Sequence, residues 1–598
     1  MKRKQLKLAT FICLASVYLW GCTASPGSNS ADGQTNRQME TNADVMPSGK
    51  TVLKQQTDMK DFKLRDKELL YEADEETSIV TMYLTIRKGN SAEGTDHTWK
   101  EINSYSAYDY DAMGTDRYQT EAILQVGDEN GPLSGEVGWD SVVPNATVQI
   151  RGQTSSRNAQ KNYKIRLKDN KGLWRGQLTI NLNKHQTDGM RFRNKLGFDL
   201  LKGIPQMMSL RTQFVHLYVK DETEGAAGVF EDYGLFTQVE QLNKKGLRTH
   251  GLDVNAHLYK INSCEFYRYE DTIKKADDPA FDEKAFEKML ECKGNTDHTK
   301  LINLLADIND YSISAESLLD KHFDMENAAY WMAFHILTGN VDTQNRNFYI
   351  YSPQNSEKWY FISWDLDGFF RKKENEVLGR TDGQAWESGV SNYWGNIMFR
   401  RFLQSDNFRE ELDRALTDLK GYLSKERLSS MIKEYRGLTE SYIWNMPDRL
   451  NESLSPEMYD LVAQEIPNEV EFNYDRYLQS LENPLPFYIG VPVEDNGILT
   501  VKWDVSYDFQ AENITYTAEI ASGYDMQNVI ASYEGIWPEM QTDLLPPGQY
   551  FIRVKARDSS GNEQYAFDYY VTEQGKEYGI KCFYILPDGT IAEDVYEE

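Results

Sequence analysis

Three polar residues, Asp342, Asn347 and Asp365, have types and spacings that suit chemistry on phosphate. Four residues separate Asp342 from Asn347, and Asp365 follows after a stretch rich in aromatic and β-branched residues. Their carboxylate and amide oxygens are the hard ligands that Mg²⁺ prefers. Phosphoryl transfer needs such a cation and close positioning of the reactants, with little covalent help from the protein. We therefore interpret this stretch as a candidate phosphoryl-transfer site.

The elements around these residues must position them. The run Asp324–Gly339 predicts a helix, with Asp324 as its N-cap, an apolar stripe on one face and Gly339 at its end. Beyond the loop that carries Asp342, residues 348–351 and 359–363 predict a hairpin, and Asp365 stands at its exit. Protein kinases use this order of helix, loop, hairpin and second Asp.

In that order of parts, Asp342 would orient or deprotonate the attacking hydroxyl, while Asn347 and Asp365 would hold the metal. A structural alternative exists for each residue. Asp342 and Asn347 can form an Asx-turn pair that holds a loop, and Asp365 with Asp367 can form a turn at a strand end. The flanking helix and hairpin favour the catalytic interpretation, because an isolated Asp-x4-Asn is common in loops.

Further sequence blocks resemble the CotH kinase family of spore-coat proteins, which are secreted atypical kinases with a divergent protein-kinase-like fold. The blocks occur in family order over about half the chain, and their joint occurrence is more specific than any one of them. They are Ile150–Arg157, Gln160–Ile165, Arg193–Asn194, Tyr233–Glu240, Leu258–Lys260, Gly339–Asn347 and Trp364–Asp367.

The resemblance implies ATP and Mg²⁺ (or Mn²⁺) as cofactors, and a phosphate-covering turn that includes Gly152, Ser155 and Ser156, whose backbone N–H groups would form an anion nest. Lys161 or Lys164 would neutralise a phosphate. These two lysines have opposite parity relative to the apolar face of their strand, and the sequence leaves the choice between them open.

The sequence also departs from standard kinases. It lacks Gly-x-Gly-x-x-Gly and His-Arg-Asp, and the helix predicted over 188–201 offers only Asp199 to pair with a lysine. Arg193 and Asn194 in that helix are expected to orient the Asp342 loop. Glu240, at the end of a strand facing the cleft, is expected to contact either the nucleotide or a basic partner.

The N-terminus predicts export and lipid anchoring. A basic start and a short apolar run end in Leu19-Trp20-Gly21-Cys22, which looks like a bacterial lipobox. Residues 1–21 would be the signal peptide, with lipid on Cys22 and a polar tether over 22–50. We therefore expect a location on the extracytoplasmic face of a bacterial cell membrane, with contact to the membrane through lipid only.

Composition limits the remaining choices. The formal net charge is −28, which disfavours nucleic acid as a partner. After Cys22 only Cys264, Cys292 and Cys582 remain, too few for a disulfide framework, although a bridge between Cys264 and Cys292 stays open.

The pattern predicts an α+β chain with a two-lobed, kinase-like domain and a β-sandwich after it. The expected parts are a β-rich region (77–147), the CotH-like domain (148–483), a fibronectin type III-like sandwich (487–575) and a tail (576–598). The sandwich carries no polar constellation. We therefore expect it to be a spacer or docking module that contributes nothing to the reaction.

The function predicted from these observations is a surface-anchored kinase that transfers the γ-phosphate of ATP to an exported protein or cell-envelope acceptor. Two alternatives remain. One is an inactive kinase-like scaffold or adhesion lipoprotein. The other is a hydrolase with Asp342 and Asp365 as paired carboxylates, against which the amide of Asn347 argues, because paired-carboxylate hydrolysis needs no such metal ligand.

Overall fold

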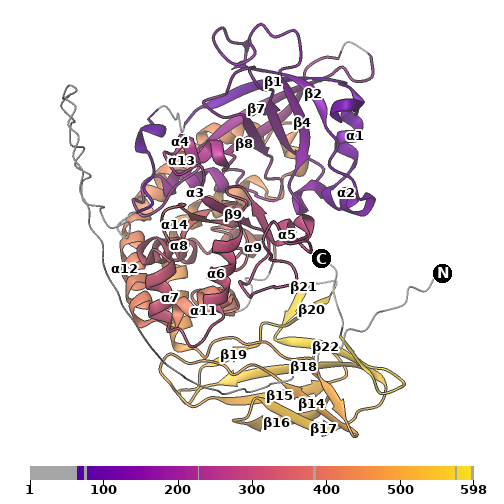
Figure 1. Ribbon diagram of the computed structural model, residues 1–598, viewed down its shortest axis with the longest axis vertical. Helices are drawn as coiled ribbons and strands as arrows, with labels where there is room; N and C mark the ends of the chain where they lie inside the picture. The colour runs from indigo at the N-terminus through magenta and orange to yellow at the C-terminus, as the bar shows by residue number, and fades with distance from the viewer. Residues whose placement is uncertain (1–62, 73–76, 226–227, 381–384, 573–574, 594–598) are drawn as a thin grey trace, which may run out of the picture. The chain divides into compact units, whose positions relative to one another are not determined.

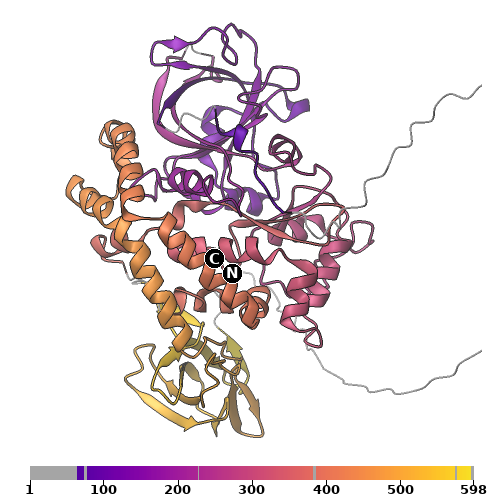
Figure 2. The same cartoon turned by 90° about the vertical axis from the view of Figure 1, so that its left-hand side faces the viewer.

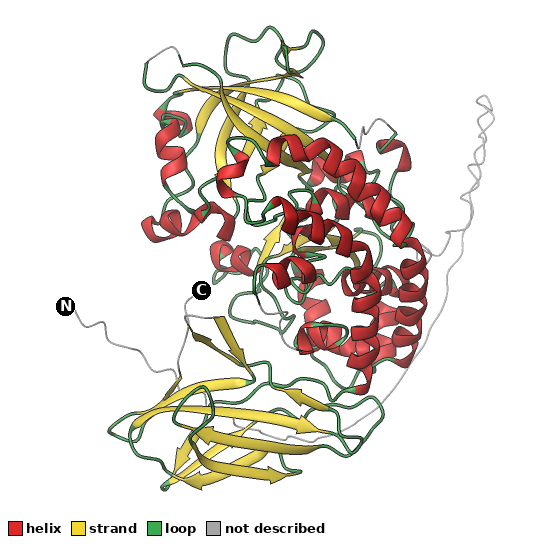
Figure 3. Cartoon of the chain, turned by 180° about the vertical axis from the view of Figure 1, so that it is seen from behind, coloured by secondary structure: helices red, strands yellow, loops and turns green. Residues whose placement is uncertain are grey.

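The computed structural model describes residues 63–72, 77–225, 228–380, 385–572 and 575–593. The predicted signal peptide, Cys22 and the tether lie outside these ranges. The described chain is mixed α+β, as predicted, and Figure 3 distinguishes its strand-rich from its helix-rich segments. No helix within the described ranges is long and apolar enough to cross a membrane.

The first sheet closes on itself. Its strands pair in the order β1-β7-β8-β6-β5-β4-β2-β3, and β1 also pairs with β2, so that the strands form a barrel (Figures 1 and 2). The strands are β1 (Ile79–Arg87), β2 (Thr120–Asp128), β3 (Gly131–Pro132), β4 (Ala146–Arg151), β5 (Asn162–Leu167), β6 (Thr179–Asn183), β7 (Thr212–Asp221) and β8 (Glu231–Glu240).

Alternation of side chains fills this barrel. In β5, Tyr163, Ile165 and Leu167 are buried in one apolar cluster with residues of the other strands, while Lys164 between them is directed outward. Because β1, β2 and β3 belong to the same sheet as β4 to β8, the predicted β-rich region and the start of the CotH-like domain form a single barrel.

A helical region and a second sheet follow. The sheet runs in the order β10-β9-β11-β12, with β9 (His257–Ile261), β10 (Leu290–Cys292), β11 (Phe348–Ser352) and β12 (Tyr360–Ser363). The helices are α1 (Trp99–Ser104), α2 (Ala107–Met113), α3 (Arg193–Leu201), α4 (Lys244–Thr249), α5 (Glu283–Met289), α6 (Thr299–Ile308), α7 (Ala315–His322), α8 (Met325–Leu337), α9 (Lys372–Val377), α10 (Ser391–Trp394), α11 (Ile397–Leu403), α12 (Asp406–Tyr422), α13 (Lys425–Ile443) and α14 (Pro456–Glu482).

Helix α8 confirms the predicted helix before the candidate site. Its N-cap Asp324 accepts a hydrogen bond from the Asn327 N–H, and Gly339 follows its end with a φ of 63°. The helix is buried from Asn327 to Leu337, and it packs on α12 and β12. The loop that carries Asp342 therefore starts from a rigid support.

The C-terminal module consists of two main sheets, as a sandwich requires. One has β13 (Val493–Asp495), β14 (Ile498–Lys502) and β17 (Glu539–Asp543). The other has β15 (Thr515–Ala521), β16 (Val529–Gly535), β18 (Gly548–Arg557), β19 (Glu563–Tyr565), β22 (Ile580–Ile585) and β23 (Ile591–Glu593). Strands β20 (Tyr569–Thr572) and β21 (Gly575–Tyr578) form a separate pair.

Two features of this module bear on the prediction. Trp503 is buried in the module's core, and the Tyr550 hydroxyl donates to the Pro546 carbonyl at the predicted corner, at 2.8 Å. Strands β22 and β23 pair in the same sheet as β18, so the module continues beyond residue 575 into the range assigned to a tail.

Candidate active site

The loop that carries Asp342 is held from behind. The Asn392 side chain donates to the Val341 carbonyl at 3.2 Å, and the Asn396 side chain donates to the Gln344 carbonyl at 2.8 Å. The Thr343 hydroxyl lies 3.0 Å from the Tyr393 hydroxyl. Helix α10 and the residues just after it therefore fix the loop, although they lie about fifty residues further along the chain.

Asp342 itself projects from this fixed loop. Its side chain is 58% exposed, and its Oδ2 accepts a hydrogen bond from the Asn347 side chain at 2.7 Å. Asn347 has a left-handed φ of 61°, which turns the chain into β11. This hydrogen bond is the contact that the structural alternative, an Asx-type loop, predicts.

Asp365 lies in a different environment. It is half-buried at the end of β12, with a left-handed φ of 54°, and the short helix η5 (Leu366–Gly368) follows it. The Asn194 side chain of α3 accepts from the Leu366 N–H at 3.1 Å, and Arg193 donates to the Phe370 carbonyl at 3.1 Å. Contrary to our expectation, these two α3 residues hold the Asp365 turn rather than the Asp342 loop.

A buried ion cluster reinforces α3. The Arg193 guanidinium pairs with both Asp188 and Glu374, and all three side chains have no solvent exposure. Glu374 belongs to α9, which follows the Asp365 turn. The turn is therefore held on both sides by groups that are costly to separate in a dry interior.

Backbone contacts bring the two acidic residues into one site. The Trp364 N–H, next to Asp365, donates to the Asn347 carbonyl at 3.1 Å. A Cβ built on Gly368 would lie 3.9 Å from the Cβ of Asp342. The Asp342 loop and the Asp365 turn are therefore neighbours, as the order of parts in the sequence predicted.

The cations around Asp365 do not fully compensate its burial and the charge of the neighbouring acid. Burial raises the pKa of its carboxyl to about 6, and the like charge of Asp367 adds to this rise. His185, Arg151 and Lys260 act in the opposite direction. A carboxylate left under-compensated in this way suits an additional cation.

A divalent cation fits the donor set. Asp365 and Asn347 carry carboxylate and amide oxygens, and Mg²⁺ is commonly held by one or two carboxylates together with substrate phosphates. Within the described residues no three or more His, Cys, Asp or Glu side chains converge on a metal position. The remaining ligands of a cation here would therefore come from the nucleotide and water.

A group of basic side chains, which we call the basic cluster, borders Asp365, and of its members only Lys164 was assigned from the sequence. Arg151 and Lys260 both lie over the Trp364 ring, at 5.8 and 5.6 Å from its centroid. Burial lowers the pKa of Lys164 and of Lys260, and the like charge of Arg151 lowers both further. Such a cluster suits an anion with several charges.

Two further features lie at the basic cluster. Burial is the largest cause that lowers the pKa of Lys164, the charges of Lys293 and Arg117 lower it further, and Glu291 acts in the opposite direction. The hydroxyl of Tyr349, which packs edge-on against Trp364, is buried and has no hydrogen-bond partner among the described residues. A polar atom of a ligand would satisfy such a hydroxyl.

The comparison with known families agrees with this geometry. The sequence model described as "CotH kinase protein" matches residues 148–478, more than half of the chain. The chain belongs to the CotH kinase family. No curated protein matches it.

Two solved structures share low overall similarity. The Helicobacter pylori proinflammatory kinase CtkA is 12% identical, with 53% of this chain and 94% of that chain covered, at a TM-score of 0.27. The HipA component of a complex of HipA, HipB and operator DNA from Shewanella oneidensis MR-1 falls in the same range: the match is 10% identical, with 57% and 65% covered, at a TM-score of 0.20.

The two candidate lysines, Lys161 and Lys164, have different surroundings in the CotH domain. Lys164 extends from the outer face of the barrel and belongs to the basic cluster. The Lys161 amine instead donates to the Ser156 carbonyl at 2.6 Å and lines a separate cavity with Trp99 and Tyr163. Side chains alternate between the two faces of a strand. Lys161, just before β5, has the parity of the buried Tyr163 and Ile165, whereas Lys164 has the opposite parity.

The turn predicted to cover phosphate is tightly built. Gly152 has a φ of 87°, and a Cβ there would lie 2.1 Å from the Ser155 hydroxyl. Ser156 is fully buried, and its hydroxyl accepts from the Ala107 N–H and donates to the Gln153 carbonyl. The Ser156 side chain thus anchors α2, while Gly152 and Ser155 lie at the outer part of the turn.

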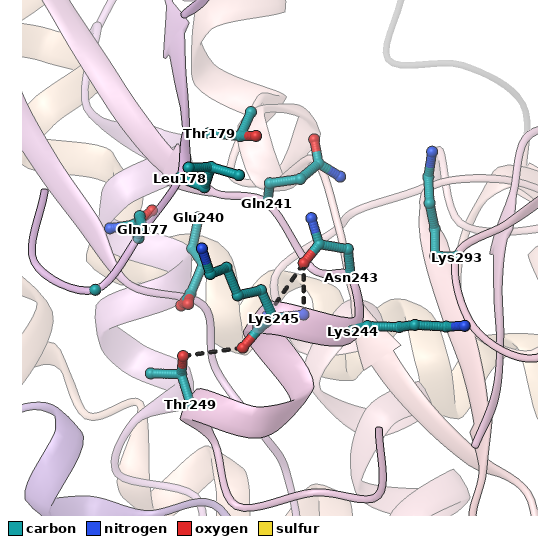
Figure 4. A pocket seen from close by; sticks show the side chains of 12 residues that line it. Gln177, Leu178, Thr179, Glu240, Gln241, Asn243, Lys244, Lys245, Thr249 and Lys293 are labelled. Atoms are coloured by element: carbon teal, nitrogen blue, oxygen red, sulfur yellow. Dashed lines mark hydrogen bonds between the residues drawn. The ribbon is translucent and has the colours of Figure 1, made fainter. Parts of the chain in front are cut away.

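Glu240 has basic partners, one of the two outcomes considered from the sequence. Its carboxylate accepts from Arg211 at 2.7 Å and lies 3.0 Å from His250. It also lines a cavity of about 370 Å³ together with Gln241, Lys245 and Lys293 (Figure 4). Because the charge of Lys293 also acts on Lys164, this cavity lies next to the basic cluster.

Cys264 and Cys292 are not bridged. Burial raises the pKa of the Cys264 thiol to about 12, so it behaves as an apolar core residue. Cys292 donates to the Asn295 carbonyl at 3.3 Å. The pairing left open by the sequence is therefore not made.

Proposed function

We propose that this CotH-family chain is an ATP- and divalent-metal-dependent phosphotransferase that acts on an acceptor outside the cytoplasm. The observation that carries the proposal is the contact between the Asp342 loop and the Asp365 turn beside the basic cluster. The Asp342 carboxylate is exposed, whereas the Asp365 carboxylate is half-buried and only partly compensated by its neighbours. Phosphoryl transfer needs one group that positions the acceptor and others that hold the metal.

Each residue has a specific task in this proposal. Arg151, Lys164 and Lys260 bind the phosphate chain, and the positions of Arg151 and Lys260 over Trp364 require little rearrangement on binding. The neighbouring cavity beside Gln241 takes the base of the nucleotide. The exposed Asp342 carboxylate orients the acceptor hydroxyl and accepts its proton.

Asp365 and Asn347 would hold the divalent cation. When bound, such a cation offsets phosphate charge and orients the group that is transferred. Asn194 keeps Asp365 in position through the Leu366 N–H, because that hydrogen bond fixes the turn on which the carboxylate stands. Asn347 links the two acids. Its side-chain nitrogen donates to Asp342, and its backbone carbonyl accepts from the N–H of Trp364, next to Asp365.

The deciding experiment measures ATP binding by the purified protein with and without Mg²⁺, followed by transfer of labelled γ-phosphate to cell-envelope proteins. Binding that depends on Mg²⁺ and on Asp365 supports the proposal. If wild type binds Mg-ATP no better than Asp365→Ala, the catalytic interpretation fails, and the inactive scaffold takes its place.

Surface anchoring through Cys22 is part of the same proposal, and it rests on the lipobox-like end of the N-terminal apolar run. Labelled palmitate should enter the wild-type protein but not Cys22→Ala. Cys13→Ala, within the apolar run, is the matched control and should keep its label. Label that persists in Cys22→Ala contradicts the anchoring proposal.

We further propose that the C-terminal module is of the fibronectin type III kind. Its three-stranded sheet faces a sheet in the order β16-β15-β18-β22, and the Tyr550 corner is a feature of such sandwiches. Its core of Leu499, Trp503 and Ile552 is separate from that of the CotH domain. Residues 487–593 expressed alone should unfold cooperatively and show the circular dichroism of a β-rich fold.

A further inference from the structure

A further cavity borders the Asp342 loop. Its volume is about 520 Å³, and its wall includes Asn340, Val341 and Gly368 from the loop and turn of the candidate active site. The opposite wall is α14, through Asn473 and Arg476. An acceptor that reaches Asp342 from this side would occupy this cavity, which we call the acceptor pocket.

The C-terminal module completes the acceptor pocket. Tyr578, at the end of β21, lines it, and the Tyr578 hydroxyl donates to Glu387 at 2.9 Å. Trp386 packs edge-on against both Tyr578 and Phe567, at centroid distances of 5.4 and 5.0 Å. Phe567 is buried in the core of the CotH domain. A module expected to contribute nothing thus supplies a side chain to the site.

These contacts also reach the catalytic loop. The segment around Trp386 leads directly into α10, whose Asn392 and Tyr393 hold the Asp342 loop. Trp394 in the same helix lies 5.1 Å from the Tyr507 ring of the C-terminal module. The module therefore packs against the segment that positions the catalytic loop.

One cation of the acceptor pocket, Arg476, is available to a ligand. Glu469 accepts from the backbone N–H groups of Lys372 and Lys373, and Glu387 accepts from Tyr578. Both carboxylates therefore have hydrogen-bond donors of their own. Within the described residues, no acidic side chain pairs with the Arg476 guanidinium. An anionic group on a ligand would satisfy Arg476 without displacing an existing partner.

Three asparagines line the pocket. The Asn392 nitrogen donates to the Val341 carbonyl and the Asn473 nitrogen to the Leu337 carbonyl, so the donor side of each amide is already used. Asn340 is only 2% exposed, and its Oδ1 has no hydrogen-bond partner among the described residues. Backbone N–H groups of a peptide would satisfy such acceptors, because they are donors without charge.

We propose that the acceptor pocket binds a peptide whose serine or threonine is flanked by acidic residues, with Arg476 as the group that recognises the acid. This inference rests on the proposed function. In the reaction, the acceptor oxygen bonds to the γ-phosphorus of ATP as the bond to the β,γ-bridging oxygen breaks. ADP leaves, and the hydroxyl proton passes to Asp342.

Peptide binding in the absence of nucleotide tests the pocket separately from catalysis. The probes are fluorescent peptides with one serine between three aspartates on each side, and a matched peptide with lysines in their place. Anisotropy should show binding of the acidic peptide at least about tenfold tighter. Arg476→Glu should abolish that preference, Arg476→Lys should keep most of it, and Tyr578→Ala should weaken acidic-peptide binding.

Arg414→Glu on α12 is the matched control, because it makes the same charge reversal at an exposed ion pair and should leave peptide binding unchanged. ATP binding should be the same in all these variants. Equal affinity for the two peptides, or an unchanged preference in Arg476→Glu, overturns the inference while leaving the proposed kinase intact. Stronger competition by an anionic polysaccharide than by unlabelled acidic peptide also overturns it. Absent Mg-ATP binding together with a normal peptide preference contradicts the proposed function but supports the pocket.

Discussion

Asp365 and Glu240 are both shielded carboxylates at the ends of strands in the CotH domain, but their surroundings differ. Glu240 is matched by Arg211 and His250, and these partners hold its pKa at about 2 despite burial. Asp365 has Asp367 beside it, and burial with this like charge raises its pKa to about 6. The first acid is balanced by the protein, and the second is not.

This contrast separates a structural acid from a functional one. Fixed partners surround Glu240, so its charge is used within the fold. Asp365 is held by backbone contacts of its turn, which position the carboxylate without neutralising it. A site that must bind an external cation benefits from such an imbalance, because the cation then supplies compensation that the protein lacks.

The largest effect is expected from Asp365→Ala. The substitution removes a hard ligand and leaves phosphate charge uncompensated, so Mg²⁺-dependent ATP binding and transfer should both be lost. Asn347→Ala should give a milder form of the same defect, since one of several ligands is removed. Calorimetric titration with Mg-ATP measures both. Normal binding by Asp365→Ala would mean that the two carboxylates do not differ as proposed.

Asp342→Asn should separate binding from chemistry. The amide keeps the size of the side chain but lacks a basic oxygen, so ATP should still bind. Transfer should fall by about 10²- to 10⁴-fold, as for loss of a positioned general base. Single-turnover transfer with labelled ATP measures this step. A variant that lost ATP binding as well would place Asp342 in the metal site.

Glu240→Gln should affect stability rather than catalysis. It leaves the Arg211 charge buried without its acid and leaves Asp66 as the remaining acid beside His250, which should cost about 3–5 kcal/mol in the free energy of unfolding. Urea denaturation measures this loss. Glu376→Gln on the exposed face of α9 is the matched control and should change stability by less than about 1 kcal/mol. If Glu240→Gln kept its stability but lost ATP binding, Glu240 would be a ligand residue.

The difference in stability between wild type and Glu240→Gln should also depend on pH. Glu240 has a pKa of about 2 against an ordinary value of 4.5, so its contribution is present above pH 4.5 and is lost as pH falls towards 2. His250 has a pKa of about 9 against 6.5, so its contribution is full below pH 6.5 and is lost as pH rises towards 9.

The difference in melting temperature between wild type and Glu240→Gln should therefore be largest between about pH 4.5 and 6.5, and it should shrink on both sides. Thermal unfolding followed by circular dichroism across this range tests it. A difference that is constant with pH would show that Glu240 and His250 do not share their charges in the folded protein.

Local patterns in the sequence predicted the helix before Asp342, the hairpin before Asp365 and the alternation in β5. Each of these elements depends on residues that are close together in the sequence, so a local pattern is enough to predict it. The same locality explains why Asp342, Asn347 and Asp365 were found together, since a single loop and hairpin connect them.

Tertiary structure decided which side chains surround those three residues. Arg151 and Lys260 come from separate strands, and no local pattern predicts that both lie over Trp364. Asn194 was expected at the Asp342 loop, yet it bonds to Leu366 because α3 packs against the short helix after Asp365. Tyr578 reaches the acceptor pocket through packing of Trp386 and Phe567.

The sequence by itself therefore determined the identity and order of the reactive groups, together with the elements that carry them. Only the tertiary structure decided their partners, because burial and charge balance depend on side chains from separate elements of the chain. The opposite pKa shifts of Glu240 and Asp365 show this directly. Both are acids at strand ends in the sequence, and their different neighbours in space make one structural and leave the other open to a cation.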